Sequence, residues 1–273
     1  MELAGIDTAV KFAANCGITS NIPPYPSMAL GAADLTLKEM TRAYATIASG
    51  GYQCPEPFLI TKVVDRDGQV LEERKPAPRP EEPIIDPAVD FQLIQLLQGV
   101  TSSGSAGGTA TTLGWPVAGK TGTTDDYSDA WFLGFSTRIT CGVWIGLDTK
   151  STIYRSATGG RTALPMWTNF MKVILPTTRK EDFKPPQGLE WIDIDIDTGL
   201  RAGPGTRRMR SLAFKPGTGP SGETDPESAA HAREAREMAK FLAVEQRTWG
   251  SFPPKTDVQP LNQLLRNIDP NDY

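Results

Sequence analysis

The chain has 273 residues and a mass of 29.6 kDa, enough for one sizeable hydrophobic core or for one domain with an appendage. Its 28 basic and 32 acidic side chains give a net charge of −4, which argues against binding to nucleic acid or to anionic lipid. The single histidine, His231, excludes a multi-histidine metal site and leaves any histidine-based catalytic triad dependent on that one residue.

Three cysteines, Cys16, Cys54 and Cys141, lie too far apart for a Cys-x-x-Cys pair. This spacing predicts reduced thiols, with neither a zinc site nor a disulfide framework. We expect no metal and no other cofactor. No apolar run approaches the roughly 18 residues of a membrane helix, and the first residues lack the features of a signal peptide. The chain taken by itself is therefore expected to be soluble, with no membrane segment.

Hydrophobic spacing predicts three helices in the first hundred residues, over residues 3–16, 34–49 and 86–98. The first has no N-cap before it, so we expect it to continue a helix of a longer protein in which Met1 is an internal residue. A turn signal, Asp65–Gly68, stands between two short strand-like runs and predicts a β-hairpin over residues 58–71.

The centre of the chain predicts an antiparallel meander, because three short strand patterns follow one another with tight turns, over residues 117–123, 130–135 and 139–147. The segments that follow predict a helix over 164–175 with Trp167, Phe170, Met171 and Ile174 on one face, a strand over 191–196, and a helix over about 226–244. The change of composition after Pro220 indicates a weakly attached tail.

The run Gly114-Trp-Pro-Val-Ala-Gly-Lys-Thr121 matches the P-loop pattern of nucleotide-binding proteins. A P-loop needs a buried strand before its first glycine and a helix that begins at its Lys-Thr pair, because backbone N–H groups surround the phosphates. Here Gly and Thr residues precede the first glycine, and a turn and a strand are predicted after Lys120. Nucleotide binding is therefore the less favoured alternative.

Lys120-Thr-Gly-Thr123 also matches the Lys-Thr-Gly element of penicillin-recognising serine enzymes. That element needs a strand edge that faces a cleft. Gly122 has no side chain, so a substrate can lie against the backbone as an added strand. The lysine supplies positive potential, the threonine hydroxyls can hold a carboxylate, and a backbone N–H can stabilise an oxyanion. Alone, this short motif is a weak signal.

The residues around the motif make the signal specific. The chain resembles class A penicillin-binding proteins of the 1A type over about residues 1–219. Six ordered segments carry the resemblance: Pro26–Gly31, Leu37–Tyr44, Gly114–Phe135, Gly142–Asp148, Ala157–Arg161 and Pro165–Trp167.

The resemblance implies cross-linking of peptidoglycan, in which a serine attacks the D-Ala-D-Ala end of a stem peptide and an amine resolves the acyl-enzyme. β-Lactams mimic that dipeptide. By resemblance, Lys120 and Thr123 are catalytic, and Thr121, Gly122, Thr123 and Thr124 bind substrate. The Thr123 N–H contributes to the oxyanion hole. Asp129 lies next to this site, and core packing is the expected role of Trp131 and Phe132.

Two other motifs of the family are absent. No serine stands three residues before any lysine, so the Ser-x-x-Lys pair of nucleophile and base is missing, and so is Ser-x-Asn. We therefore expect a fragment of a longer protein that does not react with penicillin alone. A non-catalytic module that binds stem peptide, or that partners a separately encoded N-terminal half, is the alternative. For the family, the implied location is the periplasmic side of the inner membrane.

The fold that the resemblance implies is α/β of the α+β kind: an antiparallel sheet flanked by helices, as in penicillin-binding transpeptidases and serine β-lactamases. Residues 1–180 are expected to be the C-terminal part of the transpeptidase domain, 181–219 an extension with an added strand, and 220–273 the tail. Such a part of a domain would leave apolar surface uncovered and favour aggregation.

Three polar features are expected to be solvated surface without function: the basic residues Arg201, Arg207, Arg208 and Arg210, the alternating Asp193, Asp195 and Asp197, and His231.

Overall fold

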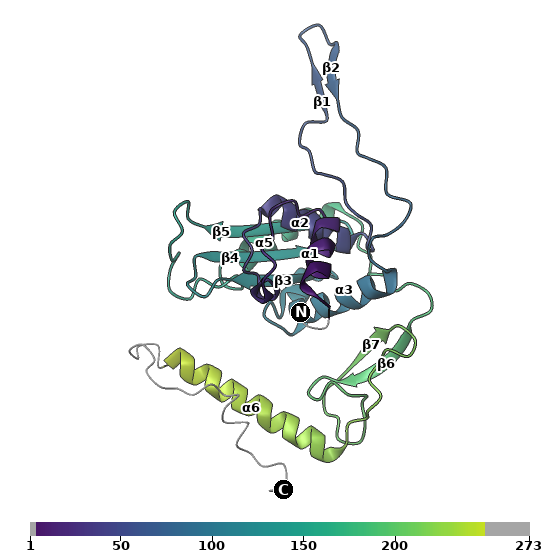
Figure 1. The fold of residues 1–273 in the computed structure, drawn as a ribbon, viewed down its shortest axis with the longest axis vertical. Helices are drawn as coiled ribbons and strands as arrows, with labels where there is room; N and C mark the ends of the chain where they lie inside the picture. Colours follow the sequence, from purple (N-terminus) through teal and green to yellow (C-terminus); the bar gives the residue numbers. More distant parts are fainter. Residues whose placement is uncertain (1–3, 249–273) are drawn as a thin grey trace. The chain divides into compact units, whose positions relative to one another are not determined.

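The structure is a computed structural model that describes residues 4–248 (Figure 1). The chain divides into two compact units. Of the described residues, the first unit comprises 4–192 together with 211–219, and the second comprises 193–210 together with 220–248. No helix within residues 4–248 is long and apolar enough to cross a membrane. The domain boundaries at residues 180 and 219 stay predictions, and residues 249–273 of the predicted tail lie outside the described residues.

Helices and strands follow the predicted order, with three short helical segments and one strand added. The helices are α1 (Ile6–Asn15), η1 (Pro26–Leu30), α2 (Leu37–Ala48), α3 (Pro87–Ser102), α4 (Thr109–Leu113), α5 (Ala163–Ile174), η2 (Leu175–Thr177) and α6 (Pro226–Thr248). The strands are β1 (Lys62–Val64), β2 (Val70–Glu73), β3 (Ala118–Thr123), β4 (Asp129–Phe135), β5 (Thr140–Gly146), β6 (Glu190–Asp195) and β7 (Met209–Phe214).

The centre of the first unit is an antiparallel sheet in the order β3-β4-β5, so the predicted meander is confirmed. Its register pairs Lys120 with Leu133 and Gly122 with Trp131 across β3 and β4, and Trp131 with Trp144 across β4 and β5. Among the described strands, β3 has a neighbour on one side only. The Lys-Thr-Gly segment therefore lies on an edge strand.

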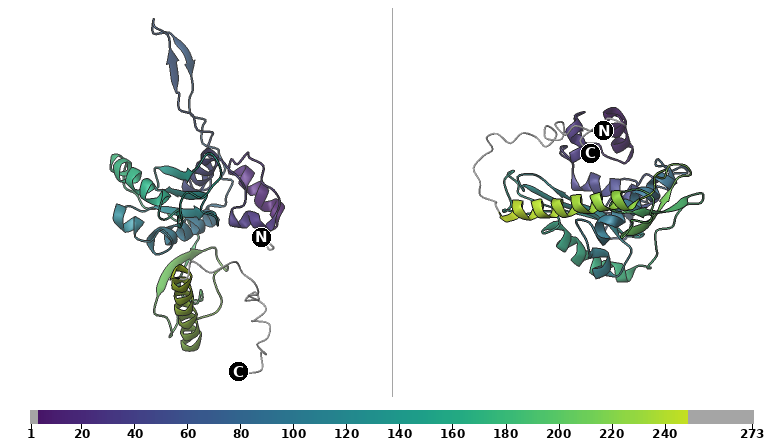
Figure 2. Two further views of the ribbon diagram at one scale, coloured as in Figure 1. Left: turned by 90° about the vertical axis from the view of Figure 1, so that its left-hand side faces the viewer. Right: turned by 90° about the horizontal axis from the view of Figure 1, so that it is seen from below.

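Helices cover both faces of this sheet (Figures 1 and 2). Successive strand residues face opposite sides, and β4 buries aromatic rings on both. Phe132 faces α5, where its ring lies 4.8 Å from that of Trp167 in an edge-to-face contact. Phe135 faces α2 and α3, and its ring lies 6.4 Å from that of Tyr44. The predicted fold class, an antiparallel sheet flanked by helices, is confirmed.

Local contacts set the helix boundaries. α2 begins at Leu37 rather than at residue 34, because Thr36 and Glu39 form a reciprocal capping box. α3 begins after Asp86, as predicted, and Asp86 Oδ1 accepts a hydrogen bond from the Ala88 N–H. It runs past its predicted end at Gln98, and Thr101 in its last turn is buried and donates to the Val117 carbonyl at 2.7 Å.

Two predictions about helices are wrong in detail. α1 begins at Ile6, because Gly5 has a φ of 77° and cannot continue a helix from residue 3; residues 1–3 lie outside the described residues. In α5, Trp167 and Met171 are fully buried, whereas Phe170 is 49% exposed. Phe170 belongs to an outward stripe with Met166 and Val173, and it does not share the buried face.

Two further strand pairs complete the fold. β1 and β2 form the predicted hairpin, in which Asp65 Oδ1 accepts hydrogen bonds from the N–H groups of Asp67 and Gln69. Val64, Val70 and Leu71 of this hairpin are all more than half exposed. β6 and β7 form a two-stranded sheet, so the predicted added strand is confirmed. All three cysteines are free, as predicted.

In the second unit, two of the alternating aspartates, Asp195 and Asp197, are not solvated as predicted. Asp195 is 1% exposed, and its Oδ1 accepts a hydrogen bond from the Asp197 N–H at 2.8 Å. Asp197 in turn binds Arg208 at 2.8 Å and Arg236 of α6 at 3.5 Å. The prediction of solvated surface is therefore wrong for Asp195 and Asp197, because β6 ends at Asp195 and the chain turns back, whereas Asp193 is exposed as predicted. His231 is exposed, as predicted.

Candidate active site

Strand β3 presents the Lys-Thr-Gly-Thr segment at its exposed end. Ala118 and Gly119 are buried at the start of the strand, and Lys120 is the first exposed residue. Lys120 and Gly122 share one face of the sheet with Leu133 and Trp131, and Thr121 and Thr123 share the other. The side chains of the lysine and of the two threonines therefore leave the strand on opposite faces, and the long lysine side chain reaches round the strand to Thr121.

The Lys120 ammonium group lies along the strand. Its Nζ donates to the Thr121 carbonyl at 2.9 Å and lies 3.4 Å from Thr121 Oγ1. Within residues 4–248, no carboxylate forms an ion pair with Lys120, so its charge remains available to an anionic ligand.

A serine that sequence reasoning missed contacts the motif. Ser105, in the loop between α3 and α4, places its Oγ 2.8 Å from Thr121 Oγ1. It lies in a stretch rich in Gly, Ser and Thr, so nothing in the local pattern distinguished it from its neighbours. The contact joins two hydroxyl groups and one ammonium group in one hydrogen-bonded chain, Ser105–Thr121–Lys120.

The loop before α5 orients Thr123. The Gly159 N–H donates to Thr123 Oγ1 at 3.0 Å, which leaves the hydroxyl proton of Thr123 free for another acceptor. A Cβ at position 159 would overlap the carbonyl oxygens of Trp131 and Gly122, so this approach requires glycine. Gly122 is also close-packed, since a Cβ there would lie 3.0 Å from Trp131 Cβ.

Thr124 closes the turn between β3 and β4. Its Oγ1 accepts hydrogen bonds from the N–H groups of Ser128 at 3.0 Å and Asp129 at 2.9 Å. Both acceptor positions of the hydroxyl oxygen are thus engaged within the turn, which favours a structural role. The assignment of Thr124 to substrate binding stays a prediction.

The aromatic and acidic residues next to the motif connect neighbouring strands of the sheet through hydrogen bonds and ring packing. Asp129 accepts hydrogen bonds from Trp144 Nε1 at 2.8 Å and from Ser128 Oγ at 2.7 Å. Trp131 packs on Trp144 with ring centroids 6.1 Å apart, and Phe132 is fully buried. Packing is therefore the role of both aromatic residues, as expected.

The geometry does not support a P-loop. Lys120 and Thr121 lie inside β3, a turn follows at residues 124–128, and β4 begins at Asp129. No helix starts at the Lys-Thr pair, so its N-terminal N–H groups are not available to surround a phosphate.

Comparisons with known proteins agree with the resemblance. A family model for the penicillin binding protein transpeptidase domain matches residues 23–171. Penicillin-binding protein 1A of Aquifex aeolicus is 40% identical over 190 residues, covering 69% of this chain and 25% of that protein. Penicillin-binding protein 2D of Bacillus subtilis is 32% identical over 252 residues, covering 90% of this chain and 36% of that protein.

A solved structure gives the same result. The crystal structure of penicillin-binding protein 1A from Haemophilus influenzae superposes with a TM-score of 0.70 at 25% identity, covering 82% of this chain and 38% of that one. The chain thus spans about a quarter to a third of the length of these curated relatives. Because the family model matches more than half of the 273 residues, the chain belongs to the penicillin-binding protein transpeptidase family.

Proposed function

We propose that the Lys120–Thr123 edge of β3 holds the D-Ala-D-Ala end of a peptidoglycan stem peptide, and that the chain takes part in peptidoglycan cross-linking by acyl transfer. The observation that supports this proposal most is an ammonium group on an edge strand that forms no ion pair with any described residue, next to a glycine and two orientable hydroxyl groups. A peptide can add to such an edge through its backbone, and its carboxylate can reach the cation and the hydroxyl groups.

Each residue of the motif has a distinct role in this proposal. Lys120 supplies positive potential beside the reacting group. Thr121 and Thr123 donate hydroxyl hydrogen bonds to the terminal carboxylate, and Thr123 is ready to do so because its oxygen already accepts from Gly159. Gly122 leaves room for the peptide backbone, and the Thr123 N–H joins the oxyanion hole.

Acylation needs a nucleophile that this sequence does not contain as a Ser-x-x-Lys motif. We therefore propose that the chain binds stem peptides and β-lactams through the β3 edge without forming a covalent adduct, and that a separate N-terminal half would supply the serine. The proposed location is the cell envelope, on the periplasmic side of the inner membrane.

The first test is the intact mass of the folded chain after incubation with benzylpenicillin, with circular dichroism on the same sample. We expect a folded protein without an adduct. A stoichiometric adduct would mean that a serine of this chain is activated, and it would overturn the account of the missing nucleophile.

The second test is an NMR titration with an N-acylated D-Ala-D-Ala dipeptide, with the L-Ala-L-Ala dipeptide as the control ligand. We expect shifts at the β3 amides with the first ligand and weaker ones with the second. Lys120→Ala should abolish them, because the carboxylate loses its cation. Lys150→Ala, at another exposed lysine, should not. Equal binding by the Lys120→Ala variant would refute the proposed site.

A further inference from the structure

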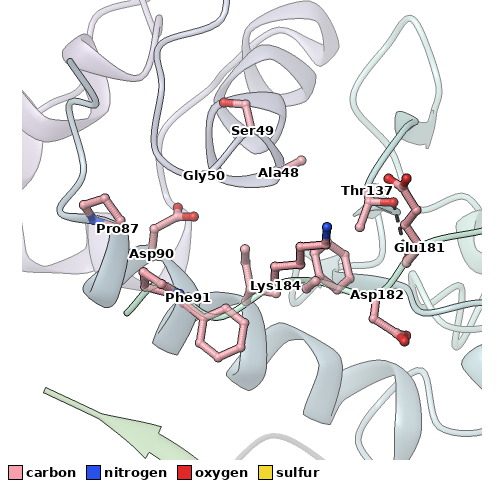
Figure 3. A pocket seen from close by; sticks show the side chains of 13 residues that line it. Ala48, Ser49, Gly50, Pro87, Asp90, Phe91, Thr137, Glu181, Asp182 and Lys184 are labelled. Atoms are coloured by element: carbon pink, nitrogen blue, oxygen red, sulfur yellow. Dashed lines mark hydrogen bonds between the residues drawn. The ribbon is translucent and has the colours of Figure 1, made fainter. Parts of the chain in front are cut away.

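A cavity of about 320 Å³ opens in the first unit, away from the Lys-Thr-Gly strand (Figure 3). Its walls come from the end of α2, the first turns of α3 and the segment 181–186. Phe91, Ile94 and Phe183 provide apolar surface. No residue of β3 lines it. The cavity is therefore separate from the proposed transpeptidase site, and its volume is at the lower end of the range for small-molecule sites.

A buried carboxylate without a partner faces this cavity. Asp90 is 1% exposed, and its Oδ1 is buried and forms no hydrogen bond with the described residues. Figure 3 shows the carboxylate pointing from α3 into the open space below Gly50. An ionised carboxylate in such surroundings is costly unless a cation or a donor neutralises it. The described residues supply neither to Oδ1, so a ligand with a positively charged donor fits the site.

The opposite wall carries a cation. Lys184 forms no ion pair or hydrogen bond with the described residues, and Figure 3 shows its ammonium group facing the same space. The two acids beside it do not compete for that space. Glu181 is paired with Arg138 at 2.7 Å and with Arg179 at 3.3 Å, and the Asp182 carboxylate points away from the cavity in Figure 3. The cavity thus has a negative group inside and a positive group at its wall.

We propose that this cavity binds a small zwitterionic amino acid, with its ammonium group on Asp90, its carboxylate toward Lys184 and its apolar side chain against Phe91 and Phe183. A zwitterion carries one group for each of the two charges, an ammonium group for the carboxylate of Asp90 and a carboxylate for Lys184. A ligand with only one of these charges satisfies only one wall.

Three probes of one shape separate the contributions: L-leucine, 3-methylbutylamine, which lacks its carboxylate, and 4-methylpentanoate, which lacks its amine. In an NMR titration of the whole chain, we expect L-leucine and the amine to shift the amides of Gly50 and Phe91, and 4-methylpentanoate to shift them far less, because its carboxylate can reach Lys184 but leaves Asp90 without a partner. Binding of 4-methylpentanoate as tightly as leucine, or shifts confined to other regions, would overturn the proposal.

Single substitutions test whether Asp90 binds the ligand ammonium group and Lys184 its carboxylate. Asp90→Asn should weaken both leucine and amine binding by about ten- to a hundredfold, the range for a hydrogen bond to a charged group. Lys184→Ala should weaken leucine and leave 3-methylbutylamine unchanged. Asp182→Asn, on the same wall but pointing away, is the matched control and should change neither. Unchanged leucine affinity in a folded Asp90→Asn variant would refute the site; should that variant not fold, Lys184→Ala tests it through the same comparison.

The affinity should also depend on pH. Burial raises the pKa of the Asp90 carboxyl to about 7, so amine binding should strengthen as pH rises through about 7 and the carboxylate ionises. The other charged groups that line the cavity are Glu181, Asp182 and Lys184, and the Cys16 thiol lies close enough to Asp90 for its own pKa to be raised by that charge, although burial is the larger cause. An affinity that falls over this range would contradict the assignment to Asp90.

Discussion

Glu39 and Asp90 are both buried carboxyl groups, and their hydrogen-bond partners give them opposite properties. Glu39 is 5% exposed and accepts hydrogen bonds from N–H and O–H groups of Thr19, Ser20 and Thr36. These bonds hold the pKa of Glu39 well below its usual range. Among residues 4–248, no such donor reaches Asp90 Oδ1, and burial raises the pKa of Asp90 to about 7. Each residue therefore makes stability depend on pH in its own direction.

Glu39→Gln should lower the free energy of unfolding by about 2–3 kcal/mol at neutral pH, because hydrogen bonds to a charged acceptor are lost. The folded-state pKa lies below the reference value of 4.5, so this stabilisation is present above that pH and is lost as pH falls below it. Urea unfolding at several pH values measures the difference. Glu56→Gln, which removes an exposed ion pair with Lys38, is the control and should have little effect. A difference that persists unchanged in acid would contradict this account.

Asp90→Asn should show the opposite pH dependence. Below the reference pKa of 3.8 the carboxyl is neutral in both the folded and the unfolded chain, and the variant should match the wild type. Between 3.8 and about 7 only the unfolded chain loses the proton, so wild-type stability falls as pH rises, by up to about 1.4 kcal/mol per unit. Above about 7 the variant should therefore be the more stable protein. Urea unfolding across this pH range, without added ligand, measures the free energy of unfolding of both proteins. A difference between them that does not change with pH would contradict the prediction.

At the scale of elements, the contact between the loop before α5 and strand β3 determines how Thr123 is presented. Gly159→Ala should destabilise the fold by about 1–3 kcal/mol, because its Cβ would overlap two backbone carbonyl groups. It should also displace the residue 159 N–H that donates to Thr123 Oγ1, and the loss of this hydrogen bond should weaken binding of the D-Ala-D-Ala dipeptide. Gly160→Ala is the matched control on the same loop: its Cβ would lie 3.2 Å from the Ser105 carbonyl oxygen and should cause a smaller loss. Equal effects of both variants on dipeptide affinity would argue against an orienting role for Gly159.

The β1–β2 hairpin, in contrast, should contribute little to the stability of the unit, because β1 and β2 contact mainly each other. Leu59 is fully exposed, and Ile60 and Leu71 are more than 60% exposed. Replacing residues 59–74 with a short Gly/Ser linker should therefore change the free energy of unfolding by less than about 0.5 kcal/mol. Urea unfolding measures this, and a loss of several kcal/mol would show that the hairpin packs on the rest of the unit.

The parts of the fold that could be predicted are those that depend on local pattern. Alternation and turn residues predict β3, β4 and β5, and the Asp86–Pro87 pair predicts the start of α3. Contacts between distant segments could not be predicted in this way. Ser105 meets Thr121, and Gly159 meets Thr123, only after the sheet has formed. The burial of Asp195 likewise depends on a turn that the alternating acidic pattern of β6 does not encode.

At the scale of the whole molecule, the division into two units also depends on contacts between distant segments, which local sequence pattern does not predict. Residues 193–210 leave the first unit and residues 211–219 return to it, so the division follows contacts made far along the chain. Composition placed the boundary near residue 220, where the flanking prolines begin. The family match, which covers residues 23–171, lies within the first unit.

The outward stripe of α5, formed by Met166, Phe170 and Val173, should control the solubility of the whole molecule. These side chains are 59%, 49% and 76% exposed on one side of the helix. Exposed apolar stripes favour self-association. Phe170→Glu combined with Val173→Lys should reduce the rise of sedimentation coefficient with protein concentration. The free energy of unfolding should change by less than about 1 kcal/mol, because both residues already face solvent. Lys172→Glu, an exposed change on the same helix, is the control and should leave the association in place. Association that persists in the double variant would assign it to another surface, and the exposed hairpin is then the next to remove.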